Sequence, residues 1–214
     1  MNIGFIGAGA ITEAIVTGLL RTSHASDTIL VSARNAEIAA RLATMSSNVK
    51  IVDDNQKIVE QSEVALLAVR PQIARSVLRP LQFPRTLKVI SLIATVPAVT
   101  VQGWIGDHIR VVRAIPLPSV ADLVGVTAIY PRDQVVEDLF RSLGKVVTAE
   151  SLQEFDGYAA TSALMGTYFG LLETSAIWMT ERGASYERAQ NYLTSLFLVL
   201  QQQRRPTIAR FQSL

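Results

Sequence analysis

The sequence predicts an α/β fold: a mostly parallel sheet in the first 150 residues, followed by an all-helical domain. Two observations predict it. Short apolar runs alternate with helical patterns up to about residue 150, which is typical of parallel strands joined by right-handed helical crossovers. From Ser151 the strand-like runs and the Gly/Pro punctuation disappear, and Leu152 to Gln203 has a helical pattern almost throughout. We therefore expect two domains, at 1–150 and 151–214.

The elements of the first domain follow from the same patterns. The run 63–69 is nearly continuous in apolar residues, as strands covered on both faces must be. Glycine at 183 is the expected break between two long helices, and 145–148 stays open between strand and linker. Strands are expected at 3–6, 28–32, 50–52, 63–69, 88–93, 110–114 and 125–130, and helices at 10–20 and 36–45.

The composition excludes several classes of function. Of the 214 residues 49% are apolar and 18% charged, which is enough for a packed core and argues against disorder. A net charge of +2 without a basic run gives no reason to expect a nucleic-acid partner. There is no cysteine, and His24 and His108 alone cannot form a zinc site, so no metal is expected. The N-terminus lacks a basic leader and Glu13 interrupts its apolar stretch, so the expected location is cytoplasmic.

One long stretch of low charge, 158–180, has two interpretations. A membrane-spanning helix is the first. Glu173 inside the stretch and the lack of flanking Lys/Arg clusters argue against it, so we expect no membrane contact. We favour a helix buried in the chain's own core or against a partner subunit, and regard Glu173 as structural. Four small residues would permit the close helix approach of a dimer interface: Ala159, Ala160, Ala163 and Gly166.

The turn Gly7-Ala8-Gly9 follows the first expected strand and opens a helix at Ala10 and Ile11. Gly7 permits the tight turn, and Gly9 lets backbone amides approach a diphosphate without a Cβ in the way. The helix N-terminus adds partial positive charge for the phosphates. Although Thr12 stands where a third Gly or Ala is usual, and a purely structural turn is the alternative, we predict a Rossmann-type dinucleotide site.

The end of the second strand indicates which dinucleotide. An NAD site usually has Asp or Glu there, whereas this chain has no acid before Glu37. Arg34 can pair with a 2′-phosphate and Ser32 and Asn35 can donate hydrogen bonds to it, so we favour NADP(H) over NAD(H). The alternative is an exposed arginine without a ligand.

The segment Val69-Arg70-Pro71 closes the fourth strand, at the sheet edge where ligands of open α/β folds bind. We therefore count these three residues as cofactor candidates. For Arg70 a plain surface charge is the alternative.

Several blocks in order resemble pyrroline-5-carboxylate reductases: Asn2-Ile-Gly-Phe-Ile-Gly-Ala-Gly9, Ser32-Ala-Arg-Asn35, Asp54-Asn55, Leu67-Ala-Val-Arg-Pro-Gln72, Val89-Ile-Ser91 and Val112-Arg113. The resemblance covers residues 1 to about 200 and is stronger in the first half. It implies NAD(P)H-dependent reduction of a cyclic imine to proline by a homodimer or higher homo-oligomer. By the same resemblance, domain 1–150 binds NADP(H) and the helical domain 151–214 serves the substrate and dimerisation, with the active site at the subunit interface. It also implies that Asn55 contacts the nucleotide. By the same resemblance the segment from Ser91 to Ala94 lies near the nicotinamide.

The substrate-side motifs depart from this family. Leu117 stands where the family has Asn in Met-Pro-Asn-Thr-Pro, and leucine cannot make the hydrogen bond of Asn. Ser162-Ala-Leu-Met-Gly-Thr-Tyr168 replaces Ser-Gly-Ser-Gly-Pro-Ala-Tyr, which makes the region more continuously helical. The family continues beyond Leu214, so 204–214 resembles the lead-in to a missing tail. The candidate proton donors are Ser162, Thr167 and Tyr168, each with the alternative of a hydroxyl bonded to its own helix backbone.

Three functions therefore remain open. We favour NADPH-dependent reduction of a small cyclic imine such as 1-pyrroline-5-carboxylate, with Leu117 predicting weak or altered activity. A reductase of another imine or carbonyl compound on the same scaffold is the second, and a non-catalytic NADP(H)-binding regulatory protein is the third.

Overall fold

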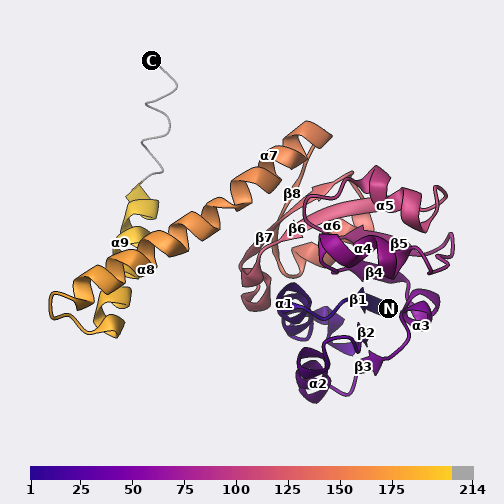
Figure 1. The fold of residues 1–214 in the computed structure, drawn as a ribbon, viewed down its shortest axis with the longest axis horizontal. Coiled ribbons are helices and arrows are strands. Elements are labelled where there is room, and N and C mark those ends of the chain that lie inside the picture. The colour runs from indigo at the N-terminus through magenta and orange to yellow at the C-terminus, as the bar shows by residue number, and fades with distance from the viewer. Residues whose placement is uncertain (204–214) are drawn as a thin grey trace. The chain divides into compact units, whose positions relative to one another are not determined.

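The computed structural model describes residues 1–203, so the expected lead-in to a tail at 204–214 lies outside the described residues. The chain divides into two compact units, the first ending at Ala159 and the second beginning at Ala160. The division falls inside helix α7 (Leu152–Ser162), somewhat after the boundary expected at residue 150. Elements are labelled in Figure 1.

The first unit is built on an eight-stranded sheet with the order β3-β2-β1-β4-β5-β6-β7-β8. Its strands are β1 (Asn2–Ile6), β2 (Thr28–Ser32), β3 (Val49–Val52), β4 (Val64–Leu67), β5 (Lys88–Ser91), β6 (Val111–Pro116), β7 (Gly125–Tyr130) and β8 (Gly144–Thr148). All neighbours pair in parallel except β6 and β7. The mostly parallel α/β fold predicted from the sequence is therefore confirmed, and the open question at 145–148 is decided as strand.

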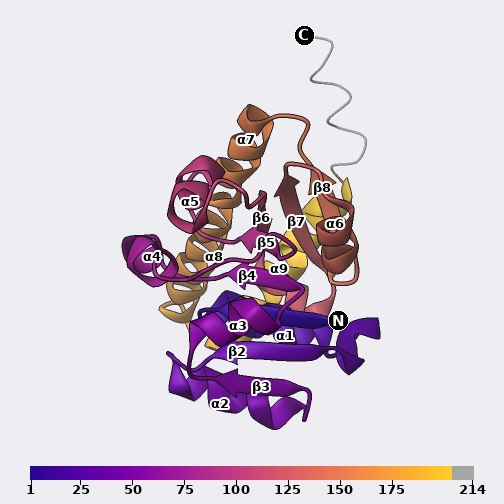
Figure 2. The same cartoon turned by 90° about the vertical axis from the view of Figure 1, so that its right-hand side faces the viewer.

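Six α-helices cover the sheet, three on each face. They are α1 (Ala10–Leu19), α2 (Ala36–Met45), α3 (Asn55–Gln61), α4 (Pro71–Leu78), α5 (Ala98–Ile105) and α6 (Gln134–Arg141), with 3-10 turns η1 (Ser23–Ser26) and η2 (Pro118–Asp122). One core cluster joins α1, α2 and α6 to the sheet, and another joins α3, α4 and α5 to its other face. Figure 2 shows α4 and α5 on one side of the strands and α6 on the other. Because both faces are covered, β4 is buried throughout and β5 is buried except at Lys88, as their apolar runs indicated.

Two strands are shorter than their apolar runs. The expected strand 63–69 is reduced to β4, and the expected strand 88–93 ends at Ser91. The residues after each strand leave the sheet as loops at its carboxyl edge, although Val69 and Ile93 remain buried. Apolar side chains in these loops serve the core without belonging to a strand, which is why the pattern overestimates strand length.

The second unit contains helices α8 (Leu164–Thr180) and α9 (Tyr186–Gln203). Gly183, in a left-handed conformation with φ 94°, lies in the turn between them and confirms the predicted break. Ala176, Ala189 and Leu193 form a small shared core. Glu173 accepts a hydrogen bond from Tyr186 across the pair at 2.5 Å, which agrees with a structural role.

Most apolar side chains of α8 are exposed, and Ala176 is its one buried residue. Leu164, Phe169 and Trp178 keep 63%, 56% and 54% of their surface exposed. Within its own unit α8 is therefore left largely uncovered, because α9 packs against only one of its sides, and burial in the chain's own core stays a prediction. Burial against a partner subunit stays a prediction. Within residues 1–203, none of the helices combines the length and apolarity that crossing a membrane requires.

Candidate functional site

The loop from β1 to α1 lies where the order of the strands reverses, between β1 and β4. Gly7 has φ 109°, and a Cβ there would lie 2.5 Å from the carbonyl oxygen of Ala68 in the loop after β4. Only glycine fits, both for its backbone and for the close approach of the second loop. This geometry is the tight turn that the sequence predicted.

Gly9 differs from Gly7 in both respects. Its φ of −117° and ψ of −176° suit any residue, and a Cβ would meet nothing within 4 Å. Gly9 is also the residue that precedes α1, whose first backbone amides have no partner within the helix. The open space therefore lies where backbone amides and helix dipole favour an anion.

Thr12 explains how the loop holds its shape without a third glycine. The side chain is fully buried, and its hydroxyl donates a hydrogen bond of 2.8 Å to the carbonyl oxygen of Gly7. Threonine in place of the usual third Gly or Ala thus links the first turn of α1 to the turn at Gly7. The spacing of the glycines did not indicate this hydrogen bond.

The end of β2 presents one charged side chain. Ser32 is buried, whereas Arg34 and Asn35 are exposed in the turn before α2. Asn35 caps α2, because its Oδ1 accepts a hydrogen bond from the backbone N–H of Ile38 at 3.4 Å. This cap leaves the amide nitrogen of Asn35 and the guanidinium of Arg34 as the donors available at this turn.

Asn55 opens α3 directly after its capping residue Asp54. Its Oδ1 is buried, and among the described residues it has no hydrogen-bond partner. Buried polar atoms are nearly always paired, so an unpaired acceptor beside the carboxyl edge of the sheet indicates a place where a ligand supplies the donor.

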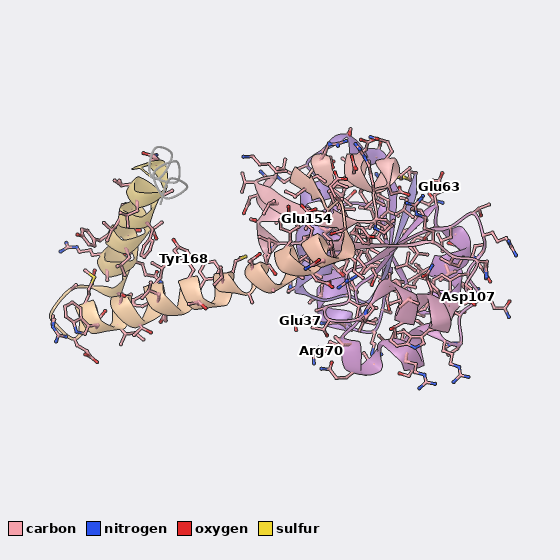
Figure 3. The ribbon with its side chains drawn as sticks, turned by 90° about the horizontal axis from the view of Figure 1, so that it is seen from above. Glu37, Glu63, Arg70, Asp107, Glu154 and Tyr168 are labelled. Carbon is pink, nitrogen blue, oxygen red and sulfur yellow. The ribbon has the colours of Figure 1, made fainter. Side chains whose placement is uncertain are left out.

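Two further loops reach the same edge. After β4, Val69 is buried, Arg70 precedes α4 with an exposed side chain (Figure 3), and Pro71 is the first residue of α4. After β5, the hydroxyl of the buried Ser91 accepts a hydrogen bond from the N–H of Ile93 at 3.4 Å, and Ala94 is exposed. Loops that follow parallel strands share one edge, so the structure brings the cofactor candidates of the sequence together there.

The loop after β5 contains a strained residue that the sequence did not indicate. Thr95 has φ 64°, in the left-handed region that a β-branched side chain rarely adopts. Its hydroxyl donates a hydrogen bond of 2.6 Å to the carbonyl oxygen of Ala94. Strain of this kind is typical of ligand-contacting segments, where the surroundings impose the backbone conformation.

Arg113 is a buried cation that the sequence showed only as part of a motif. It lies beside Ser91 in the register of β5 and β6 and is 7% exposed. Its guanidinium lies 3.0 Å from Asp156 and 4.5 Å from the ring centroid of Phe155, both on α7. The sequence indicates Arg113 only as a charged residue inside an otherwise apolar strand. Its partners Phe155 and Asp156 come from a distant helix and are determined by tertiary packing. Arg113 thus anchors the start of α7 on the sheet.

The candidate proton donors lie in the helical unit. Ser162 ends α7, and Ala163 keeps a helical conformation before α8, so the backbone is almost continuously helical here, as the substitutions suggested. Thr167 is exposed on α8, and so is Tyr168 (Figure 3), whose ring contacts those of Phe169 and Phe197 with centroids at 5.5 and 5.2 Å. All three stay predictions.

Leu117 lies at the end of β6, in the position expected to face the substrate. It is half-buried and precedes η2 without a side-chain cap. The side chain of Leu117 offers no hydrogen-bond donor or acceptor at this end of β6.

Comparison with known proteins bears on the fold and the class of the chain. A family model described as NADP oxidoreductase, coenzyme F420-dependent, matches residues 2–95. The chain is 30% identical over 182 residues to pyrroline-5-carboxylate reductase of Pasteurella multocida, covering 79% of this chain and 66% of that protein. It is 27% identical over 192 residues to the Pseudomonas aeruginosa reductase, covering 85% and 68%. The solved 1-pyrroline-5-carboxylate reductase of Streptococcus pyogenes shares the fold, with a TM-score of 0.81 at 24% identity over 96% of this chain and 80% of that one.

Fold and site together define the class, an oxidoreductase of the NAD(P)H-dependent kind with a Rossmann-type domain. Within this class the chain belongs to the pyrroline-5-carboxylate reductase family, which confirms the resemblance seen in the motif blocks. The chain spans about two thirds of the length of the curated relatives it matches.

Proposed function

We propose that the protein is an NADPH-dependent reductase of a small cyclic imine, with 1-pyrroline-5-carboxylate as the substrate that its relatives indicate. The open space at Gly9, over the N-terminus of α1, is the observation that carries the proposal. NADP(H) fits the residues present, because a diphosphate would occupy that space and a nucleotide hydroxyl or amino group could pair with the unpartnered Oδ1 of Asn55.

Different residues of the first unit would bind different parts of NADPH. Backbone amides at Gly9, Ala10 and Ile11 bind the diphosphate, and Arg34 pairs with the 2′-phosphate, which distinguishes NADPH from NADH. The loops at Arg70 and Ala94 would hold the far end of the dinucleotide. NADPH would supply the hydride when bound, and these residues would orient it.

The proton for the reduced nitrogen is assigned to the hydroxyl candidates Ser162, Thr167 and Tyr168. A homodimer is part of the same proposal, supported by the exposed apolar side chains of α8. Size-exclusion chromatography with light scattering tests it directly. The expected cytoplasmic location also stays a prediction.

Oxidation of NADPH by the purified protein, followed by absorbance with and without 1-pyrroline-5-carboxylate, tests the activity. We expect slow turnover in the wild type and a higher kcat/KM in Leu117→Asn, which restores the hydrogen-bonding side chain of the family at the end of β6. No turnover in either protein at saturating imine would refute the proline assignment.

Leu117 favours a second candidate, a reductase of a more apolar imine or a carbonyl compound. A panel of cyclic imines, linear imines and keto acids with NADPH separates the two substrates. Tight NADPH binding without turnover of any compound would instead support the non-catalytic function.

A further inference from the structure

An ion pair joins the first two helices of the first unit. Arg41 of α2 donates from Nε to Oε1 of Glu13 at 2.6 Å and from Nη2 to Oε2 at 2.9 Å, so the carboxylate of α1 receives a two-pronged contact. The hydrogen bond from Arg41 also holds the pKa of Glu13 below its usual value. The geometry is that of a strong guanidinium–carboxylate pair, although both groups are partly exposed.

The two helices carry the two anion-binding parts of the candidate site. Helix α1 begins at the open space of Gly9, and α2 begins after the turn that holds Arg34 and Asn35. The pair between Glu13 and Arg41 therefore links the element expected to hold the diphosphate to the element expected to hold the 2′-phosphate.

A carboxylate at Glu13 is unexpected, because it lies near the place proposed for an anionic ligand. A carboxylate in the first turn of a helix interacts favourably with the helix dipole, yet here it lies in the same turn that would bind phosphates. An uncompensated charge at this position repels an anion over about 10 Å, which is roughly one Debye length at ordinary ionic strength. Glu37 adds a second carboxylate, whose Oε1 lies 3.5 Å from Nη1 of Arg41.

We propose that Arg41 is a positioning residue for the cofactor, because it neutralises Glu13 and so preserves the attraction of the α1 N-terminus for phosphate. The inference rests on the proposed function. NADPH carries a 2′-phosphate that NADH lacks, so the contribution of Arg41 is larger for NADPH.

The dissociation constants of NADPH and NADH for the wild type, Arg41→Ala, Glu13→Gln and the double variant test this proposal. We expect Arg41→Ala to raise the constant for NADPH between about threefold and tenfold, with a smaller change for NADH. Adding Glu13→Gln to Arg41→Ala is expected to restore binding to near the wild-type value. The loss in Arg41→Ala should also shrink as salt is raised.

Arg21→Ala is the matched control, since it removes an exposed arginine just past the opposite end of α1. Its dissociation constants should equal those of the wild type. Unchanged NADPH binding in Arg41→Ala would overturn the proposal. Weakened binding that Glu13→Gln does not restore would also overturn it, since the pair would then act as a mechanical brace. Failure of the wild type to bind NADPH would refute the proposed function together with this inference.

Discussion

Gly9→Ala separates binding from stability at the candidate site. The backbone of Gly9 at φ −117° and ψ −176° is extended, and a Cβ at this position meets no protein atom within 4 Å. The added methyl group therefore costs the unliganded protein nothing in strain or contact. It projects into the space that we assign to the diphosphate, so its whole effect should fall on the cofactor.

Two small and opposite contributions set the expected change in the free energy of unfolding of Gly9→Ala. Alanine is a poorer residue than glycine before a helix, by roughly 0.5–1 kcal/mol. It also restricts the unfolded chain, which stabilises the protein by about 0.4–1 kcal/mol. The free energy of unfolding should thus change by less than about 0.5 kcal/mol. The dissociation constant of NADPH should rise by about tenfold or more, equivalent to at least about 1.4 kcal/mol.

Gly7→Ala is the matched comparison, two residues away in the same loop. Here a Cβ would lie 2.5 Å from the carbonyl oxygen of Ala68, and the backbone is in the left-handed region with φ 109°. The left-handed backbone alone costs about 1–2 kcal/mol, and the clash adds to it. This variant should lose both stability, by more than about 2 kcal/mol, and cofactor binding.

Urea unfolding and NADPH fluorescence titration of the three proteins measure both quantities. A Gly9→Ala protein that binds NADPH as tightly as the wild type would refute the assignment of the open space to the diphosphate. A loss of stability in Gly9→Ala as large as in Gly7→Ala would refute the geometric reasoning.

Four further predictions follow from other parts of the first unit. Arg34→Ala should raise the dissociation constant of NADPH about tenfold or more and leave that of NADH within about twofold, measured by titration of both; equal changes would contradict a 2′-phosphate contact. Thr95→Gly should raise the free energy of unfolding by about 0.5–1 kcal/mol, because it relieves a left-handed β-branched residue. Phe155→Ala, which empties a fully buried site, should lower it by about 3–4 kcal/mol in urea unfolding, and a loss below about 1 kcal/mol would contradict the packing of α7 on the sheet. The pKa of Glu13 is lowered by Arg41, so its stabilisation is present above its usual pKa and is lost as pH falls through the folded value; Glu13→Gln should be less stable than the wild type near pH 7, with the difference disappearing in acid.

Much of the fold could be predicted because its elements are marked locally. Strands β2 and β7 begin and end where their apolar runs do, and the turn at Gly7 follows from residues adjacent in the chain. The lengths of β4 and β5 were overestimated, because Val69 and Ile93 are apolar and buried although they lie in loops after these strands. The surroundings of α8 could not be predicted, since an apolar helix has the same sequence whether it is buried by its own chain or left for another surface.

The sequence by itself determined the α/β class, the glycine turn, the likeness to one reductase family and the position of Leu117, because each depends on residues close together in the chain. Only the tertiary structure decided which strand pairs antiparallel, that the hydroxyl of Thr12 holds Gly7, that Oδ1 of Asn55 is left without a partner, and that Arg113 and Arg41 meet Asp156 and Glu13. These contacts join residues distant in the chain through side-chain direction and helix packing. Sequence periodicity records which face of an element is apolar, but it does not record which polar groups are brought together when that face is buried.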